Sequence, residues 1–276
     1  MSLTDQMIVI TGAASGIGRA TAQAFAARGA RLALCDRDAA GLASLKGELR
    51  DQVVLAEVVD VGDRGQMERF AAAVHARVPA ADVIVNNAGV GQHGGVLETS
   101  LDEWDRVLRV NLMGVVHGSH FFVPRMAERG RGHVVNVSSM LGLYATPSAI
   151  AYVASKFAVL GLTLSMRGEL SGKGVRATAI CPGMIATNII EQTPFQPGQE
   201  SLRASVAKTF RSKGTSPAAV ASAIVESIGR DVAIRPVTKE AWVAWGATRF
   251  APRAVVDALG RYATRMQDRM TRSATG

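Results

Sequence analysis

Short, continuously apolar runs alternate with longer helical patterns from the start of the chain to about residue 182. The runs are rich in β-branched residues, as expected of strands that are buried on both faces of a sheet. They are MIVIT (7–11), RLALC (31–35), VVLAEVV (53–59), DVIVN (82–86), HVVNVS (133–138) and VRATAI (175–180). Amphipathic or alanine-rich stretches lie between them. This alternation predicts βαβ units, and therefore an α/β fold with one doubly wound parallel sheet in a single domain and helices on both faces.

The pattern changes after Pro182. Residues 184–215 contain prolines, glycines and isolated apolar residues, which predicts a long mobile loop with short helices, and such loops are typical of lids or of disorder. A helix is expected near SPAAVASAIVESI and a strand near VAIRPV. We assign residues 1–237, including the 184–215 loop, to the main domain. Residues 238–276 form an extension that we expect to be basic, amphipathic and helical.

Composition limits the class of protein. The 276 residues are 48% hydrophobic and 20% charged, which is typical of a globular chain. Cys35 and Cys181 lie far apart without the spacing of metal ligands, so we expect two buried free thiols, a reducing compartment and no metal. The sequence shows neither a signal peptide nor a continuous apolar span of membrane length. These features predict a cytoplasmic protein.

The net charge of +8 is unevenly distributed. From residue 249 onward the chain has six arginines and two aspartates, a net +4 in the last 28 residues, so the rest of the chain is only mildly basic. No motif that reads RNA or DNA accompanies this charge, and we therefore expect no nucleic-acid partner.

A glycine-rich segment, TGAASGIG (Thr11–Gly18), connects the first expected strand to a helix. Glycines at these positions allow a tight turn, close approach of the backbone to a pyrophosphate, and packing of helix on strand. The helix N-terminus offers free N–H groups to the anion. This arrangement predicts a Rossmann-type site for a dinucleotide cofactor.

Asp36 follows the second expected strand, 20 residues beyond Gly16. A carboxylate there can accept hydrogen bonds from a ribose 2′-hydroxyl and would repel a 2′-phosphate, which favours NAD(H) over NADP(H). Arg37 is adjacent and could instead pair with a 2′-phosphate. We therefore predict NAD as the cofactor and keep NADP as the less favoured alternative.

Tyr152 and Lys156 are four residues apart in the segment AYVASK. If the segment is helical, their side chains lie on one face and can converge. A phenol has a pKa of about 10, and a nearby cation favours the phenolate. The pair is therefore a candidate general acid or base whose pKa the lysine lowers.

These motifs and several others, taken in order, make roughly residues 5 to 230 resemble the short-chain dehydrogenase/reductase family. The motifs are TGAASGIG, Asp60 after the third strand, NNAG (86–89) after the fourth, Asn111 in a long helix, Ser139, YVASK (152–156), and CPG (181–183) followed by Thr187. The spacing TGxxxGxG resembles that of the compact enzymes of the family.

The resemblance implies roles for these residues. Tyr152 would exchange a proton with the substrate oxygen, Lys156 would favour the phenolate and hold the nicotinamide ribose, and Ser139 would orient the reacting oxygen. Asn111 would hold a water of a proton relay through its backbone carbonyl, and Ser138 would have a structural role. The implied cofactor-binding residues are Gly12, Ser15, Gly16, Ile17, Gly18, Asp36, Arg37, Asp60, Val61, Asn87, Ala88, Gly89, Tyr152, Lys156, Pro182, Gly183 and Thr187.

The implied substrate pocket is largely apolar. We expect it to be lined by His93, Met140, Tyr144, Met184 and Ile189, with Leu141, Leu143, Ile185, Ile190 and Phe195 nearby. Such a lining suggests a lipophilic alcohol or ketone. The alternative is that these apolar residues pack the loop onto the core, and that His93 is an ordinary loop residue.

The extension departs from the compact family pattern. Val255, Leu259, Tyr262, Met266 and Met270 recur at helical spacing with arginines between them. One interpretation is peripheral contact with an anionic membrane, with tryptophans at the interface. The other is packing against the body or a partner subunit. Family members are often homodimers or homotetramers, and we expect the same here.

Together these features predict an NAD(P)-dependent oxidoreductase, with NAD preferred, that acts on a small-molecule alcohol or ketone. The alternative from another class is a dinucleotide-binding sensor or scaffold without catalysis. The set Asn111, Ser139, Tyr152 and Lys156 argues against it, because a binding module does not need an activated phenol.

Overall fold

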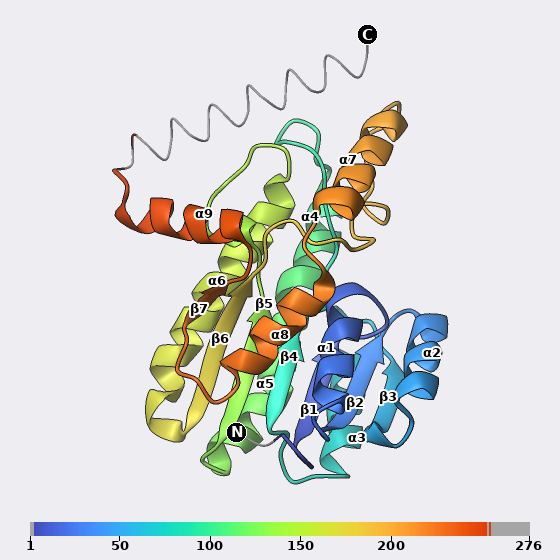
Figure 1. Cartoon of the computed structure of the whole chain (residues 1–276), viewed down its shortest axis with the longest axis vertical. Coiled ribbons are helices and arrows are strands. Elements are labelled where there is room, and N and C mark those ends of the chain that lie inside the picture. Colours follow the sequence, from blue (N-terminus) through green and yellow to red (C-terminus); the bar gives the residue numbers. More distant parts are fainter. Residues whose placement is uncertain (1–2, 253, 255–276) are drawn as a thin grey trace.

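The computed structural model describes residues 3–252 and 254 and contains a seven-stranded sheet (Figure 1). Every pair of neighbouring strands is parallel, in the order β3-β2-β1-β4-β5-β6-β7. The strands are β1 (Met7–Thr11), β2 (Arg31–Asp36), β3 (Val53–Val58), β4 (Val83–Asn86), β5 (Gly132–Val137), β6 (Val175–Cys181) and β7 (Ile234–Pro236). The doubly wound α/β prediction is confirmed, including a short seventh strand near VAIRPV.

Helices cover both faces of the sheet (Figure 1). One face carries α1 (Gly16–Ala26), α2 (Ala39–Leu49) and α8 (Pro217–Ser227), and the other carries α3 (Arg64–His75), α4 (Leu101–Leu108), α5 (Gly114–Glu128) and α6 (Ile150–Leu170). Alternate residues of each strand point to opposite faces. In β1, Ile8 and Ile10 pack toward α1 and α8, whereas Met7 and Val9 pack toward α3 and α5. The continuously apolar strand sequences follow from this two-sided burial.

Helix α6 is the longest described helix, and the stretch Ile150–Lys173 is apolar enough by composition to cross a membrane. It packs instead along β5 and β6, and 39% of its apolar window is buried within the fold. Tyr152 and Lys156 lie in its first two turns.

The prediction of a long loop with short helices over residues 184–215 is partly wrong. Residues Glu200–Lys213 form one helix, α7, of 14 residues, and the irregular segment before it ends at Gln199. Leu202, Val206 and Phe210 recur every four residues along α7 and line one cleft. A single apolar stripe in a polar sequence is enough to place the helix over that cleft.

The long helix expected around Asn111 is continuous but irregular. A π-helical segment, Arg109–Met113, joins α4 to α5. Pro124 lies inside α5, which therefore lacks one backbone hydrogen-bond donor there.

The C-terminal extension begins with α9 (Lys239–Phe250), which starts at the cap residue Thr238. Ala241 is buried, and Trp245 packs on the cluster formed by Leu143, Ala179 and Cys181. The described part of the extension therefore packs against the body. The apolar series Val255, Leu259, Tyr262, Met266 and Met270 lies outside the described residues.

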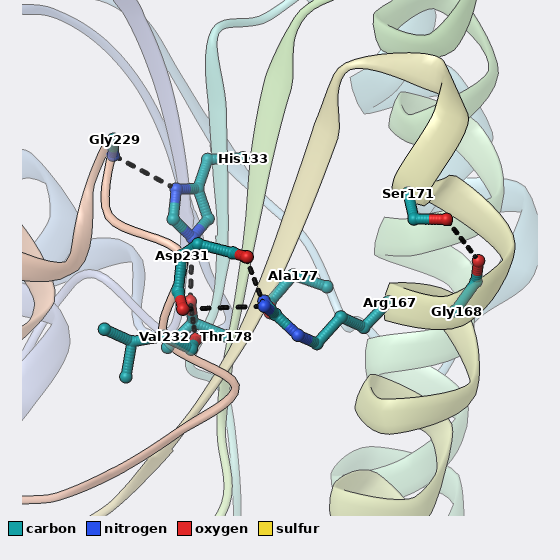
Figure 2. Close-up of polar contacts among 9 residues, drawn as sticks. All are labelled: His133, Arg167, Gly168, Ser171, Ala177, Thr178, Gly229, Asp231 and Val232. Atoms are coloured by element: carbon teal, nitrogen blue, oxygen red, sulfur yellow. Dashed lines mark hydrogen bonds and ion pairs between the residues drawn. The ribbon is translucent and has the colours of Figure 1, made fainter.

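A buried polar network ties the amino-terminal part of β5 to its neighbours (Figure 2). The backbone N–H of Gly229 faces Nδ1 of His133 at 3.4 Å, and Nε2 of His133 lies 2.9 Å from Oγ1 of Thr178. Thr178 in turn donates to the carbonyl of Val232 at 2.7 Å. Because Thr178 uses its proton for Val232, Nε2 must be the protonated nitrogen and Nδ1 the acceptor, so the network requires a neutral imidazole.

An ion pair closes this network on the side of α6. Arg167 pairs with Asp231 and also donates to the carbonyl of Ala177 at 3.3 Å (Figure 2). Burial, together with the charges of Arg176 and Arg167, lowers the pKa of His133 to about 4. The network lies at the opposite end of β5 from Ser138 and Ser139, and so it stabilises the sheet away from the candidate site.

Candidate active site

A cleft of about 1310 Å³ opens at the carboxyl ends of the strands. The sheet order places β1 beside β4, so the chain reverses its winding direction between them, and ligands of doubly wound sheets bind at such a point. The volume exceeds the roughly 300–1,000 Å³ of a site for one drug-sized ligand. All but three of the predicted cofactor, catalytic and substrate residues line this cleft, the exceptions being Gly18, Asn111 and Leu143, which packs in the core.

The glycine-rich loop is held against the end of β4. Asn87 donates from Nδ2 to the carbonyls of Thr11 and Gly12, both at 3.0 Å. The hydroxyl of Thr11 accepts from the backbone N–H groups of Asn87 and Ala88. Asn87 therefore supports the loop in addition to lining the cleft, and the phosphate-binding backbone has a fixed shape.

Close packing explains two of the glycines. Gly12 has φ +65°, and a Cβ there would lie 2.7 Å from Cα of Ala88. A Cβ on Gly18 would overlap the carbonyl of Gly12. Gly18 therefore acts by packing α1 against the loop, consistent with its position behind the cleft.

We expect Gly12→Ala to weaken NADH binding at least about tenfold, because the left-handed backbone and the contact with Ala88 would both force the loop to move. Titration of NADH fluorescence measures this loss. Gly47→Ala is the matched control, since Gly47 lies in α2 with no atom within 4 Å of an added Cβ. Equal NADH affinity in the Gly12 variant and the control would contradict the assigned role of the loop.

Acidic groups mark one end of the cleft. Asp36 accepts from the backbone N–H groups of Ala14 and Asp38, at 2.8 and 2.9 Å, so this carboxylate is fixed at the end of β2. Arg37 lines the cleft beside it.

Asp60 pairs with Arg109, with 2.6 Å between Oδ2 and Nη1. Arg109 also lines the cleft and was not predicted from the sequence, because it reaches Asp60 only through the packing of the π-helical segment against the end of β3.

Tyr152 and Lys156 lie on one face of α6, as predicted. The Nζ atom of Lys156 is 5.6 Å from the centre of the Tyr152 ring and donates to the carbonyl of Val137 at 2.9 Å. Ser139 hydrogen-bonds to Tyr152 and accepts from the N–H of Leu141. Ser138 donates to the carbonyl of Lys156 at 2.8 Å, and so it fastens α6 to β5.

The expected lowering of the Tyr152 pKa is not found. Burial raises the pKa of Tyr152, and the hydrogen bond with Ser139 only partly offsets it. Lys156 is itself buried, which lowers its pKa to about 8. The Lys156 ammonium donates to the carbonyl of Val137, and desolvation therefore dominates the environment of the phenol.

Asn111 lies in the π-helical segment and is fully buried. Its Oδ1 accepts from the N–H of Val90 at 2.7 Å, and its Nδ2 donates to the Val90 carbonyl and to the Ser155 hydroxyl. Asn111 therefore connects the loop after β4 to α6, one turn from Tyr152. Segments of π-helix are frequent at functional sites.

The other end of the cleft is largely apolar. Met140, Tyr144, Met184 and Ile189 line it as predicted, and the ring of His93 stacks on Phe195 with centroids 4.2 Å apart. This stack joins the loop after β4 to the loop after β6. Sequence reasoning missed Leu202, Val206 and Phe210 of α7, whose four-residue spacing was the available signal, and Glu240 of α9.

A family model described as short chain dehydrogenase matches residues 6–196, which include the glycine loop, Ser139, Tyr152 and Lys156. The chain belongs to the short-chain dehydrogenase/reductase family. Relatives that match this chain include a dehydrogenase and a reductase.

Individual relatives also match most of the chain. A protein of Mycobacterium tuberculosis, "Probable oxidoreductase EphD", is 42% identical over 260 residues, which cover 91% of this chain and 44% of that protein. The chain thus spans less than half the length of this relative. Levodione reductase of Leifsonia aquatica is 37% identical over 205 residues, covering 72% and 77% of the two chains.

Solved short-chain dehydrogenases share the fold. The structure from Burkholderia phymatum, in complex with NAD, has a TM-score of 0.82 and 30% sequence identity, covering 90% of this chain and 93% of that one. The levodione reductase structure has a TM-score of 0.76 and 30% identity, covering 90% and 99%.

Proposed function

We propose that the protein interconverts an alcohol and a ketone with NAD(H), using Tyr152 as the acid or base. The observation that carries the proposal is the position of Ser139, Tyr152 and Lys156 between the glycine loop and an apolar pocket in one cleft. A nicotinamide cofactor supplies or accepts the hydride when it is bound. A phenol at this position supplies the proton exchange that the reaction also needs.

The residues of the cleft fit such a cofactor. The loop has no room for side chains at Gly12 and Gly18, and its backbone N–H groups lead into the N-terminus of α1. The carboxylate of Asp36 lies at the end of β2, where a ribose 2′-hydroxyl can donate to it. Lys156 can hold the second ribose near Tyr152.

The chain's own residues then have distinct tasks. Tyr152 exchanges a proton with the substrate oxygen, and Ser139 hydrogen-bonds to that oxygen and orients it. Burial keeps the phenol protonated, which suits protonation of a carbonyl. Asn111 holds the loop after β4 against α6 and so keeps the phenol in place.

Asp36 favours NADH and Arg37 favours NADPH. Titrations with NADH and with NADPH therefore show which of the two residues selects the cofactor. We expect NADH to bind at least about tenfold more tightly, because Asp36 repels a 2′-phosphate. Asp36→Ala should reduce this preference, whereas Arg37→Ala should leave NADH affinity near that of the unaltered protein. Tighter binding of NADPH would instead make Arg37 the selector, and binding of neither would overturn the proposed function.

The predicted homodimer or homotetramer stays a prediction.

The second candidate function is a sensor or scaffold without catalysis. The buried Lys156, held 5.6 Å from the Tyr152 ring, favours the enzyme. Burying an amine lowers the stability of the fold, and binding a dinucleotide does not require a buried amine beside a phenol.

A further inference from the structure

Glu240 brings the C-terminal helix into the substrate end of the cleft. Helix α9 lies beyond the ends of β6 and β7 (Figure 1), and Glu240 in its first turn lines the cleft with Tyr144 and Met184. Its Oε1 accepts from the N–H of Met184 at 3.1 Å, and Thr238 also hydrogen-bonds to the carboxylate. The carboxylate is therefore fixed, although the residue is exposed.

This carboxylate differs from the other acids of the cleft. Among the described residues that line it, the acids are Asp36, Asp38, Asp60 and Glu240. Asp36 ends β2, Asp38 comes after it and Asp60 comes after β3, all at the cofactor end. Glu240 alone follows β7, and it hydrogen-bonds to Met184 in a part of the cleft that Met140 and Tyr144 also line. The substrate end thus combines apolar residues and uncharged polar groups, such as Gln92 and Gln192, with one acidic group.

Glu240 is ionised at neutral pH. Partial burial raises the pKa of Glu240, but hydrogen bonds from its own N–H, from Thr238 and from Met184 outweigh burial and leave that pKa below its usual value. Burial and the charge of Glu240 both raise the pKa of Tyr144, which keeps that phenol protonated.

We propose that Glu240 is a specificity-determining residue that selects substrates carrying a hydroxyl or ammonium donor away from the reacting carbon and rejects anionic ones. The inference rests on the proposed function and deepens it by naming the substrate class. A carboxylate held in place by three hydrogen bonds keeps acceptor capacity for a substrate donor. It also places a like charge against an incoming carboxylate, which suppresses wrong ligands.

The test uses methyl ketones of increasing chain length that end in a methyl, hydroxyl or carboxylate group. For each chain length, kcat/KM is measured with NADH and expressed relative to the methyl compound. In the unaltered protein we expect the hydroxyl compound to be favoured and the carboxylate compound disfavoured. Glu240→Gln should raise the carboxylate ratio about five- to tenfold and lower the hydroxyl ratio, since an exposed charge has a modest effect.

Two controls separate specificity from structure. Glu226→Gln removes an equal charge outside the cleft, where Glu226 pairs with Arg235, and should leave both ratios unchanged. If Glu240→Gln lowers kcat/KM for all three compounds in parallel and weakens NADH binding, the carboxylate only holds the turn at Met184, and the inference is overturned. If the unaltered protein reduces none of the ketones, the proposed function is wrong, and the inference that depends on it is wrong as well.

Discussion

Replacing Tyr152 by phenylalanine is expected to lower kcat by on the order of 10²–10⁴-fold while leaving the affinity for NADH nearly unchanged. The substitution removes one hydroxyl and keeps the ring that lies against Lys156. The variant lacks the hydroxyl that hydrogen-bonds to Ser139 and that exchanges a proton with the substrate oxygen in the proposed mechanism. Turnover is measured from NADH consumption, and binding from its fluorescence.

Tyr144→Phe is the matched control, because it makes the same change in the same cleft. We expect this variant to alter KM for ketones more than kcat. Retention of more than about a tenth of the turnover in Tyr152→Phe would defeat the role given to the phenol. Loss of NADH binding would instead mean that the ring is part of the cofactor site.

Acidification is expected to destabilise the fold through His133. Burial lowers the pKa of His133 to about 4 from the 6.5 of a free histidine, so the unfolded chain binds the proton more readily. The stabilisation is complete above pH 6.5 and is lost as the pH falls from about 6.5 to about 4. The loss amounts to about 3 kcal/mol, and denaturant titrations at several pH values measure it.

The comparison that isolates this effect uses two histidines. His133→Asn removes the titrating group, and the free energy of unfolding should then change less steeply between pH 6.5 and pH 4. His120 is exposed, and His120→Asn should keep the slope of the unaltered protein. Identical slopes in all three proteins would mean that His133 is not the group whose protonation destabilises the network in Figure 2.

Features that depend on local sequence were predictable. Six strands, the glycine loop and the Tyr152–Lys156 pair follow from periodicity and short spacings, and each occurs where it was expected. Contacts between distant segments were not. Arg109 reaches Asp60 across 49 positions, and Glu240 meets Met184 across 56, so no pattern within either segment indicates the partner.

Burial was the other source of error. The spacing of Tyr152 and Lys156 predicted their common face, but the direction of the tyrosine pKa shift depends on how much protein surrounds both groups. The length of helix α7 was also not predicted, since only short helices were expected in this segment. The four-residue spacing of Leu202, Val206 and Phe210 is present in the sequence, but only the cleft that the helix covers shows what these residues contact.

The π-helical segment has a consequence for any alignment or redesign of this region. Widening a helix by one residue advances every later side chain by about 100° relative to a regular helix. The apolar faces of α4 and α5 are therefore out of phase across Arg109–Met113. Deleting one residue there would restore a regular helix, but it would rotate Gly114–Glu128 away from the sheet or withdraw Asn111 from Val90 and Ser155. The segment is thus a point at which a single deletion is more disruptive than most substitutions.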